Sequence, residues 1–405
     1  MPIVNRIAGM HDEITAWRRD FHENPELLYD VQRTASVVVE KLKAFGCDEV
    51  VPGIGRTGVV GVINGRGPGT GVGLRADMDA LSIVEETGKP YASTIAGKMH
   101  ACGHDGHTTM LLAAARHLAA TRNFNGRAIL IFQPSEEGGT GAQEMVASGM
   151  LDRFGVDEVY ALHNMPGLPI GAFATPPGPL MAASNQFWIE LSGRGSHAAA
   201  PHLAVDTVLI GAEIIVALQA IVARNVDPVD QAVVSVAMAQ IGDTFNILPA
   251  RGLLRGTCRA MELRVLDLLE ARVEQISTAV AAMHGGTAKV RFWRDSPATV
   301  SSEGGYAHAV DVAKRIAGAG NVNANCPPAL VAEDFAYMLE ARPGAFVFIG
   351  NGDRAVLHHP ADGNPVQPVG QRESRRIVQV QQRAVEVVPR RDELKQRHGR
   401  QRRPR

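Results

Sequence analysis

The sequence is poor in cysteine and lacks the apolar segments of secreted or membrane proteins. Its four cysteines, Cys47, Cys102, Cys258 and Cys326, lie far apart, and this spacing excludes the dense disulfide framework of small secreted domains. The first residues contain no apolar core of the signal-peptide kind, and we find no stretch long enough to cross a membrane. We therefore expect a cytoplasmic protein without a membrane partner.

A strong net charge is also absent, because 41 basic residues face 42 acidic ones. This balance hides an asymmetry: residues 372–405 hold twelve Lys and Arg against four Asp and Glu, and the preceding residues hold 29 against 38. The acidic body makes nucleic acid an unlikely partner there. The basic end leaves one separate alternative open, a tail that binds nucleic acid or another acidic surface.

The order of the predicted elements indicates two domains, for which 405 residues suffice. Before residue 183 the pattern predicts helices at 14–21 and 34–45 and strands at 59–63, 72–77, 127–132 and 158–162. Residues 184–294 follow the order βαββαβ of a ferredoxin-like module, with strands at 186–191, 231–241, 252–259 and 288–293 and helices at 205–224 and 263–283. Afterwards the first pattern returns, with helices at 308–317 and 333–340 and a strand at 345–349.

We therefore predict an α/β fold with an insertion. A discontinuous catalytic domain would comprise residues 1–183 and 295–363, and an α+β domain at 184–294 would be inserted into it. Residues 364–405 would form an atypical basic tail.

Reactive side chains concentrate in residues 100–107, which contain one thiol, three imidazoles and one carboxylate. The Ala- and Leu-rich run that follows predicts a helix, and the positive end of this helix favours a thiolate at Cys102. A thiolate and neutral imidazoles are ligands for zinc or a similar divalent ion. An isolated Cys-x-His pair is better explained by an inert cysteine beside surface histidines, so the choice depends on the rest of the chain.

Further donors follow the predicted strands, at the edge where open α/β sheets place their sites. With them the chain offers five donors: Cys102, His104, Glu137, His163 and His358. Five exceed what one tetrahedral ion with an open position needs, and a pair of ions sharing the thiolate or a water accounts for them. The neighbouring Glu136 then fits a general base that carries a proton from bound water to the leaving amine. Without the cluster, the two glutamates would be interpreted as a solvated acidic turn.

The chain resembles the M20 family of metallopeptidases and amidohydrolases, above all its aminoacylase-like branch of hippurate hydrolases and indole-acetyl-amino-acid hydrolases. The matching motifs follow the family's order between residues 14 and 360. They are residues 73–81 (GLRADMDAL), 99–107 (MHACGHDGH), 133–139 (QPSEEGG), 161–164 (ALHN), 193–202 (GRGSHAAAPH), 246–249 (NILP), 256–259 (GTCR), 333–335 (EDF) and 357–360 (LHHP).

The resemblance implies a zinc-peptidase-like catalytic domain, a lid or dimerisation domain as the insert, and two divalent ions (Zn, Mn, Co or Ni). It implies a homodimer or homotetramer that hydrolyses a small N-acyl amino acid, such as a hippurate-like or N-acetyl compound, to a carboxylic acid and a free amino acid. Glu136 takes the general-base role. The metal-ligand role falls on Cys102, His104, Glu137, His163 and His358, the last chosen over His359 because it directly follows Leu357.

In the insert, the resemblance implies that His197 donates a hydrogen bond to the developing oxyanion, often across a dimer interface. Asn246 and Arg259 match positions that hold the substrate, and the bidentate fork of arginine suits a carboxylate. Asp77 fits a carboxylate that orients a ligand. His100 and His107 are assigned structural roles.

The chain departs from the family pattern at Ser82, where proline is usual, and after Pro360, where a Gln- and Arg-rich segment replaces a closing amphipathic helix. We expect residues from about 364 onward to be poorly ordered. Two alternatives remain open: a dipeptidase of the same family, which would recognise a charged N-terminus, and a catalytically impaired relative with a basic binding tail.

Overall fold

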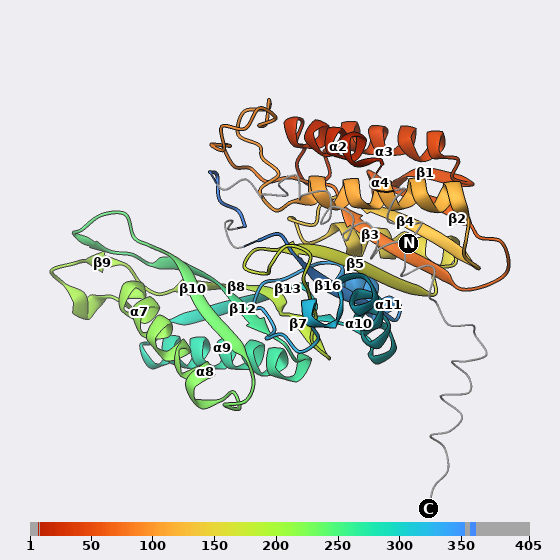
Figure 1. Cartoon of the computed structure of the whole chain (residues 1–405). Coiled ribbons are helices and arrows are strands. Elements are labelled where there is room, and N and C mark those ends of the chain that lie inside the picture. Colours follow the sequence, from red (N-terminus) through yellow and green to blue (C-terminus); the bar gives the residue numbers. More distant parts are fainter. Residues whose placement is uncertain (1–6, 8, 353–356, 362–405) are drawn as a thin grey trace, which may run out of the picture. The chain divides into compact units, whose positions relative to one another are not determined.

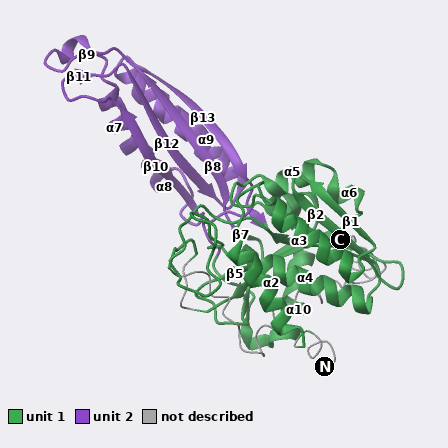
Figure 2. Ribbon diagram, turned by 90° about the horizontal axis from the view of Figure 1, so that it is seen from above, with its two compact units in different colours: residues 1–180, 300–327, 334–405 green, residues 181–299, 328–333 purple. Residues whose placement is uncertain are grey.

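The computed structural model describes residues 7, 9–352 and 357–361, which form two compact units (Figures 1 and 2). Unit 1 comprises residues 1–180, 300–327 and 334–405, and unit 2 comprises residues 181–299 and 328–333. The divisions predicted from the sequence lie at 183/184 and 294/295, and residues 328–333 were predicted to belong to the catalytic domain. The later second division follows from a strand that continues to Ser296, beyond its predicted end. The predicted tail, residues 364–405, lies outside the described residues.

Unit 1 is built on a mainly parallel sheet, eight-stranded among the described residues, in the order β1-β2-β4-β3-β5-β16-β6-β15. Its strands are β1 (Glu49–Ile54), β2 (Gly58–Asn64), β3 (Gly71–Asp77), β4 (Arg127–Gln133), β5 (Glu158–Met165), β6 (Phe173–Ala174), β15 (Val322–Asn323) and β16 (Gly344–Gly350). The four central strands β4, β3, β5 and β16 run parallel, with Leu74 opposite both Leu130 and Tyr160. Their near-continuous apolar sequences fit strands buried on both faces.

Helices cover the sheet of unit 1, and Figure 1 shows α2 (His11–Glu23), α3 (Gln32–Phe45) and α4 (His104–Thr121) side by side. These three helices share one apolar core with α10 (Glu303–Ala317) and with alternate strand residues such as Leu74 and Leu130. The shorter helices are α5 (Gly141–Ala147), α6 (Met150–Arg153) and α11 (Ala336–Ala341), with a 3₁₀ turn at Ala319–Asn321. As expected from sequence, Gly46 ends α3, because its φ of 82° suits glycine.

Unit 2 contains an antiparallel sheet of order β10-β12-β8-β13, formed by β8 (Ala183–Ser192), β10 (Ala232–Ile241), β12 (Arg251–Ala260) and β13 (Thr287–Ser296). Its helices α7 (Thr207–Leu218), α8 (Ala220–Arg224) and α9 (Leu263–Met283) share a core with the sheet. A small ribbon of β9 (Ser196–His197) and β11 (Ile247–Leu248) is added, with a 3₁₀ turn at Pro201–Leu203. The first strand lies between the last and the third, which confirms the ferredoxin-like prediction. Strands β7 (Pro179–Met181) and β14 (Thr299–Val300) lie where the chain passes between the units.

One helical stretch of unit 2 contradicts the prediction that no part of the sequence is long enough to cross a membrane. Among the described residues, the helical stretch Thr207–Arg224 has the length and apolar composition of a span, and 33% of it is buried within the protein. Ile210, Ile214 and Leu218 of this stretch are fully buried in the core of unit 2. Packing in the core therefore explains the apolar residues on one side of this helical stretch.

Candidate metal centre

Residues 104–107 of the segment rich in reactive side chains form the first turn of α4, and residues 100–103 directly precede this helix. Gly103, at a φ of 98°, precedes the helix, and its carbonyl accepts the His107 N–H at 3.1 Å. His104 is therefore the first helical residue, and Cys102 lies just before the helix. Both side chains are buried; Cys102 lies near His163 in β5, and His104 lies near Asp77, the last residue of β3.

A first group of donors consists of Cys102, Glu137 and His358, whose candidate ligand atoms all lie within 4.8 Å of one another. The His358 Nε2 lies 3.6 Å from the Glu137 Oε1. His358 has a φ of 64°, which is rare for a residue with a Cβ. Its N–H donates to the Ala101 carbonyl at 3.2 Å, which places it beside Cys102.

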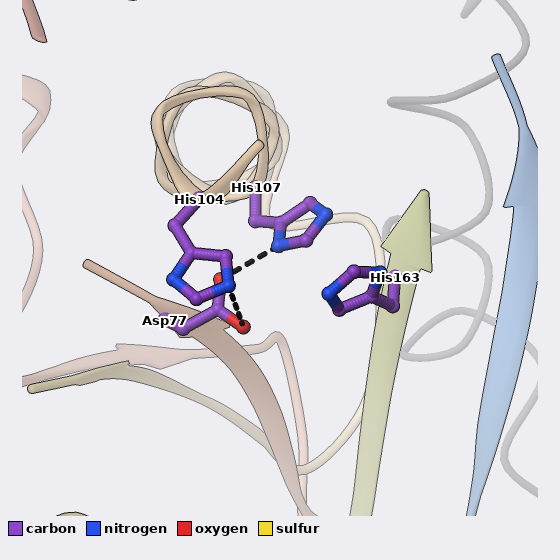
Figure 3. Close-up of side chains that lie close together, drawn as sticks. All are labelled: Asp77, His104, His107 and His163. Atoms are coloured by element: carbon purple, nitrogen blue, oxygen red, sulfur yellow. Dashed lines mark hydrogen bonds and ion pairs between the residues drawn. The ribbon is translucent and has the colours of Figure 1, made fainter. Parts of the chain in front are cut away.

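A second group involves the same thiol. The Cys102 Sγ lies 3.5 Å from the His163 Nε2, and the His163 and His104 rings meet edge to face at 5.9 Å (Figure 3). The His163 Nδ1 donates to the Asn164 carbonyl at 2.7 Å, so the lone pair of the neutral ring is on Nε2. Burial keeps the pKa of His163 well below its usual value. The thiol is thus common to the two groups of donors.

The backbone of Glu136 and Glu137 is held by the carboxylate of Asp79, to which no role was assigned from the sequence. Buried Asp79 accepts the backbone N–H groups of Glu136 and Glu137, both at 3.1 Å. Its Oδ1 also lies 3.4 Å from the His104 Nδ1. The Glu136 Oε2 lies 3.9 Å from the other ring nitrogen, His104 Nε2. Asp79 therefore holds the backbone of both glutamates beside His104, and its spacing of two from Asp77 was the signal available in the sequence.

Asp77 and His107 lie beside the candidate ligands His104 and His163 and are hydrogen-bonded to each other (Figure 3). The His107 Nδ1 donates to the Asp77 Oδ1 at 2.6 Å, and its Nε2 accepts the Asn164 N–H at 3.1 Å. The Asp77 Oδ2 accepts from buried Arg75 at 2.8 Å and lies 3.7 Å from the His104 Nε2. Burial opposes the Asp77 charge, but His104, His107 and Arg75 outweigh it and hold the pKa of Asp77 well below its usual value. Both His107 nitrogens have partners, as a structural histidine requires.

The donor atoms of this cluster fit a bound divalent cation. Among the described residues, both His104 nitrogens and the Glu137 Oε1 are buried without a hydrogen-bond partner, which is costly unless a ligand satisfies them. Sulfur, imidazole and carboxylate donors suit zinc and similar ions. Burial raises the pKa of the Cys102 thiol far above its usual value. A bound cation would offset this cost of burial and stabilise the thiolate.

The three predicted residues of the insert lie at two places in unit 2. His197 and Asn246 are exposed neighbours, because Ala198 N–H donates to the Asn246 carbonyl at 3.0 Å. His197 ends β9 and Asn246 directly precedes β11, and Figure 2 shows these two strands together at one end of unit 2. Arg259 lies toward the other end of β12, opposite Ser184, roughly 25 Å along the strand from its first residue. Burial lowers the pKa of Arg259, and its Nη1 has no hydrogen-bond partner among the described residues.

Comparison with known proteins places this fold and site among described relatives. The model of Peptidase family M20/M25/M40 matches residues 73–364. The chain is 40% identical to hippurate hydrolase of Campylobacter jejuni over 359 residues, covering 89% of this chain and 93% of that protein. It is 37% identical to N-acetyl-L-cysteine deacetylase of Bacillus subtilis, covering 88% and 84%. The crystal structure of the Bacillus subtilis YXEP protein, described as a dinuclear metal binding peptidase from M20 family, matches with a TM-score of 0.79 and 29% identity over 94% of this chain and 99% of that one.

The parallel sheet, the inserted ferredoxin-like unit and the buried Cys/His/carboxylate cluster define a metal-dependent hydrolase. The chain belongs to peptidase family M20/M25/M40, and its relatives make it an amidohydrolase of that family. The resemblance inferred from the sequence motifs is thereby confirmed.

Proposed function

We propose that this enzyme hydrolyses the amide bond of small N-acyl amino acids to a carboxylic acid and a free amino acid. The observation that carries the proposal is the position of Cys102, whose thiol belongs to the Glu137/His358 group and also lies 3.5 Å from the His163 Nε2. Such an arrangement suits two neighbouring ions. The names of the relatives, hippurate hydrolase and N-acetyl-L-cysteine deacetylase, support the substrate class.

In this proposal five residues hold two divalent ions, either zinc, manganese, cobalt or nickel: Cys102, His104, Glu137, His163 and His358. When bound, the ions lower the pKa of a water molecule and polarise the substrate carbonyl. Glu136 accepts the proton of that water on its carboxylate and returns it to the departing amine. Its position 3.9 Å from His104, with its N–H fixed by Asp79, supports this role.

The half-buried Arg259 binds the carboxylate of the amino acid, since its Nη1 is without a hydrogen-bond partner among the described residues. His197 and Asn246 complete the site with a donor to the oxyanion and a contact to the substrate. His197 and Arg259 lie toward opposite ends of the unit 2 sheet. This separation supports a site to which one subunit contributes His197 and its partner contributes Arg259.

The proposed assembly is a homodimer, or a homotetramer built from it. Strand β10 is an edge strand of its sheet among the described residues, and unpaired edges invite pairing with another chain. Exposed apolar side chains lie near it, with Val216 72% exposed and Met238 40% exposed. A second copy covering this surface explains the apolar outer face of Thr207–Arg224 without a membrane. We place the enzyme in the cytoplasm, where thiols such as Cys102 stay reduced.

We expect His197→Ala to lower kcat much more than substrate affinity and to leave the metal content unchanged, because His197 is remote from the donors along the sequence and belongs to unit 2. Mixing His197→Ala protein with inactive Glu136→Gln protein should restore part of the activity through hybrid dimers. Recovery is measured after subunit exchange has been demonstrated with labelled chains. No recovery in exchanged hybrids would contradict action across the interface.

A substrate panel tests the proposed specificity. Metal-stripped protein reloaded with Zn, Mn, Co or Ni is given N-benzoylglycine, N-acetyl amino acids and unblocked dipeptides, and the released amino acid is quantified. We expect turnover of the N-acyl compounds. Hydrolysis of dipeptides alone would favour the dipeptidase alternative, and binding of two ions without any turnover would favour the impaired relative.

A further inference from the structure

A second buried cluster of charged side chains lies outside the metal centre, between α2 and the start of α4. The Asp105 Oδ2 forms an ion pair with Arg18, whose Nε lies 2.8 Å away, and accepts a hydrogen bond from the His22 Nδ1 at 2.7 Å. The opposite nitrogen of the same ring, His22 Nε2, donates to the Glu85 Oε1 at 3.2 Å. All four side chains are almost completely buried. The cluster therefore ties Glu85 to a rigid part of unit 1.

Glu85 belongs to residues 82–98, a long irregular segment that begins and ends at the bridge between Leu81 and Met99. The Glu85 carboxylate organises this segment from inside, because it accepts the Ser93 N–H at 2.6 Å and the Thr87 hydroxyl. Burial opposes the Glu85 charge, but the bonds from His22, Thr87 and Ser93 outweigh it and lower the pKa of Glu85 to about 2. The carboxylate thus keeps its charge and its partners at neutral pH.

A backbone hydrogen bond connects this segment to residues 357–361, the loop that carries His358. The Glu86 N–H donates to the Pro360 carbonyl at 2.8 Å, and the His358 N–H donates to the Ala101 carbonyl at 3.2 Å. These two backbone bonds attach residues 357–361 to the rest of unit 1 at His358 and at Pro360, while the His358 side chain itself is 51% exposed. The strained φ of 64° at His358 requires such support from its surroundings.

We propose that Glu85, clamped by His22, is a positioning residue that holds His358 over the metal centre through the Glu86–Pro360 bond. The proposal rests on the assignment of His358 as a metal ligand. A buried ion pair contributes little net stability but fixes one conformation. If the clamp is released, His358 spends less time in place, and the apparent affinity of the ion that it binds falls with the occupied fraction.

The test is a metal titration of the full chain after stripping, in competition with a chromophoric chelator and with Zn as the probe. We expect Glu85→Gln to weaken one of the two ions by about ten-fold, the lower end of the effect of losing a supporting partner, and to leave the other ion unchanged. Excess Zn should restore kcat, which it would not do for a variant that is merely misfolded. Asp48→Asn is the matched control, because Asp48 also accepts a backbone N–H, from Asn64, and pairs with Arg122.

A second pair of variants isolates the backbone bond. Glu86→Pro removes the N–H donor, whereas Glu86→Ala keeps it and changes only an exposed side chain. We expect Glu86→Pro to weaken the same ion as Glu85→Gln, and Glu86→Ala to bind both ions normally. Unchanged affinity for both ions in Glu85→Gln and Glu86→Pro would overturn the proposal.

Two further measurements distinguish a wrong ligand assignment for His358 from a wrong role for Glu85, and cover the case in which the variants do not fold. His358→Ala should lose the same ion, and normal binding of two ions by that variant would refute the ligand assignment itself rather than the clamp. If Glu85→Gln and Glu86→Pro fail to fold by circular dichroism, hydrogen exchange in the unmodified chain decides. Loading Zn should slow exchange at the Glu86 amide together with residues 357–361, and unchanged exchange at Glu86 would contradict the proposal.

Discussion

Replacing Glu136 with Gln should abolish most turnover while both ions stay bound. Glutamine keeps the shape of the side chain and the backbone N–H that Asp79 accepts, but its amide cannot take up a proton. General-base catalysis contributes roughly 10²–10⁴-fold, and we expect a loss of at least this size in kcat. The measurement is the hydrolysis rate of N-benzoylglycine or an N-acetyl amino acid, with metal content determined on the same sample.

Glu144→Gln is the matched control for this variant. Glu144 lies in the following helix α5, is partly exposed and pairs with Arg56 at the surface. An exposed pair of this kind contributes little, so the control should remain active. Near-normal activity of Glu136→Gln with full metal content would remove Glu136 from the mechanism.

Replacing Cys102 with Ala should lower metal content and activity together. The thiol lies 3.5 Å from His163 and also belongs to the Glu137/His358 group, so its removal affects both groups of donors. A methyl group cannot bind a cation, and metal affinity follows the ligand set. We expect less than two ions per chain after dialysis, measured by elemental analysis, and activity that falls in step with the lost metal.

Cys47→Ala serves as the control for the loss of a thiol in the same unit. Cys47 is partly buried, packs against the apolar core of unit 1 and belongs to none of the donor groups. It should retain two ions and full activity, with at most a modest loss of stability. Two tightly bound ions in Cys102→Ala would contradict a shared thiolate.

The motifs of the sequence were sufficient to predict the architecture and the candidate donors, because both depend on local patterns. Glu137 and His163 follow the predicted strands 127–132 and 158–162, which indicates that both side chains lie at one edge of a parallel sheet. The βαββαβ order of residues 184–294 likewise predicts its sheet, since the connections constrain how the strands can pair. The metal-ligand set and the catalytic residues remain predictions that the variants above test.

Other features depend on contacts between distant segments and could not be read from the sequence. Asp79 organises the site only because β3 ends beside the turn that follows β4, so that its carboxylate meets the N–H groups of Glu136 and Glu137. The burial of Cys102 also depends on surrounding segments, and without a bound cation it raises the pKa of the thiol. The link from Glu85 to His358 crosses more than two hundred residues of sequence.

The most direct test of the metal-dependent mechanism is a titration of stripped, full-length protein with Zn or Mn while hydrolysis of an N-acyl amino acid is followed. We predict no turnover without metal, a rise as the donor groups fill, and a plateau at two ions per chain. Full activity of protein that has been shown to be metal-free, or a plateau at one ion per chain, would contradict a centre of two ions that share Cys102.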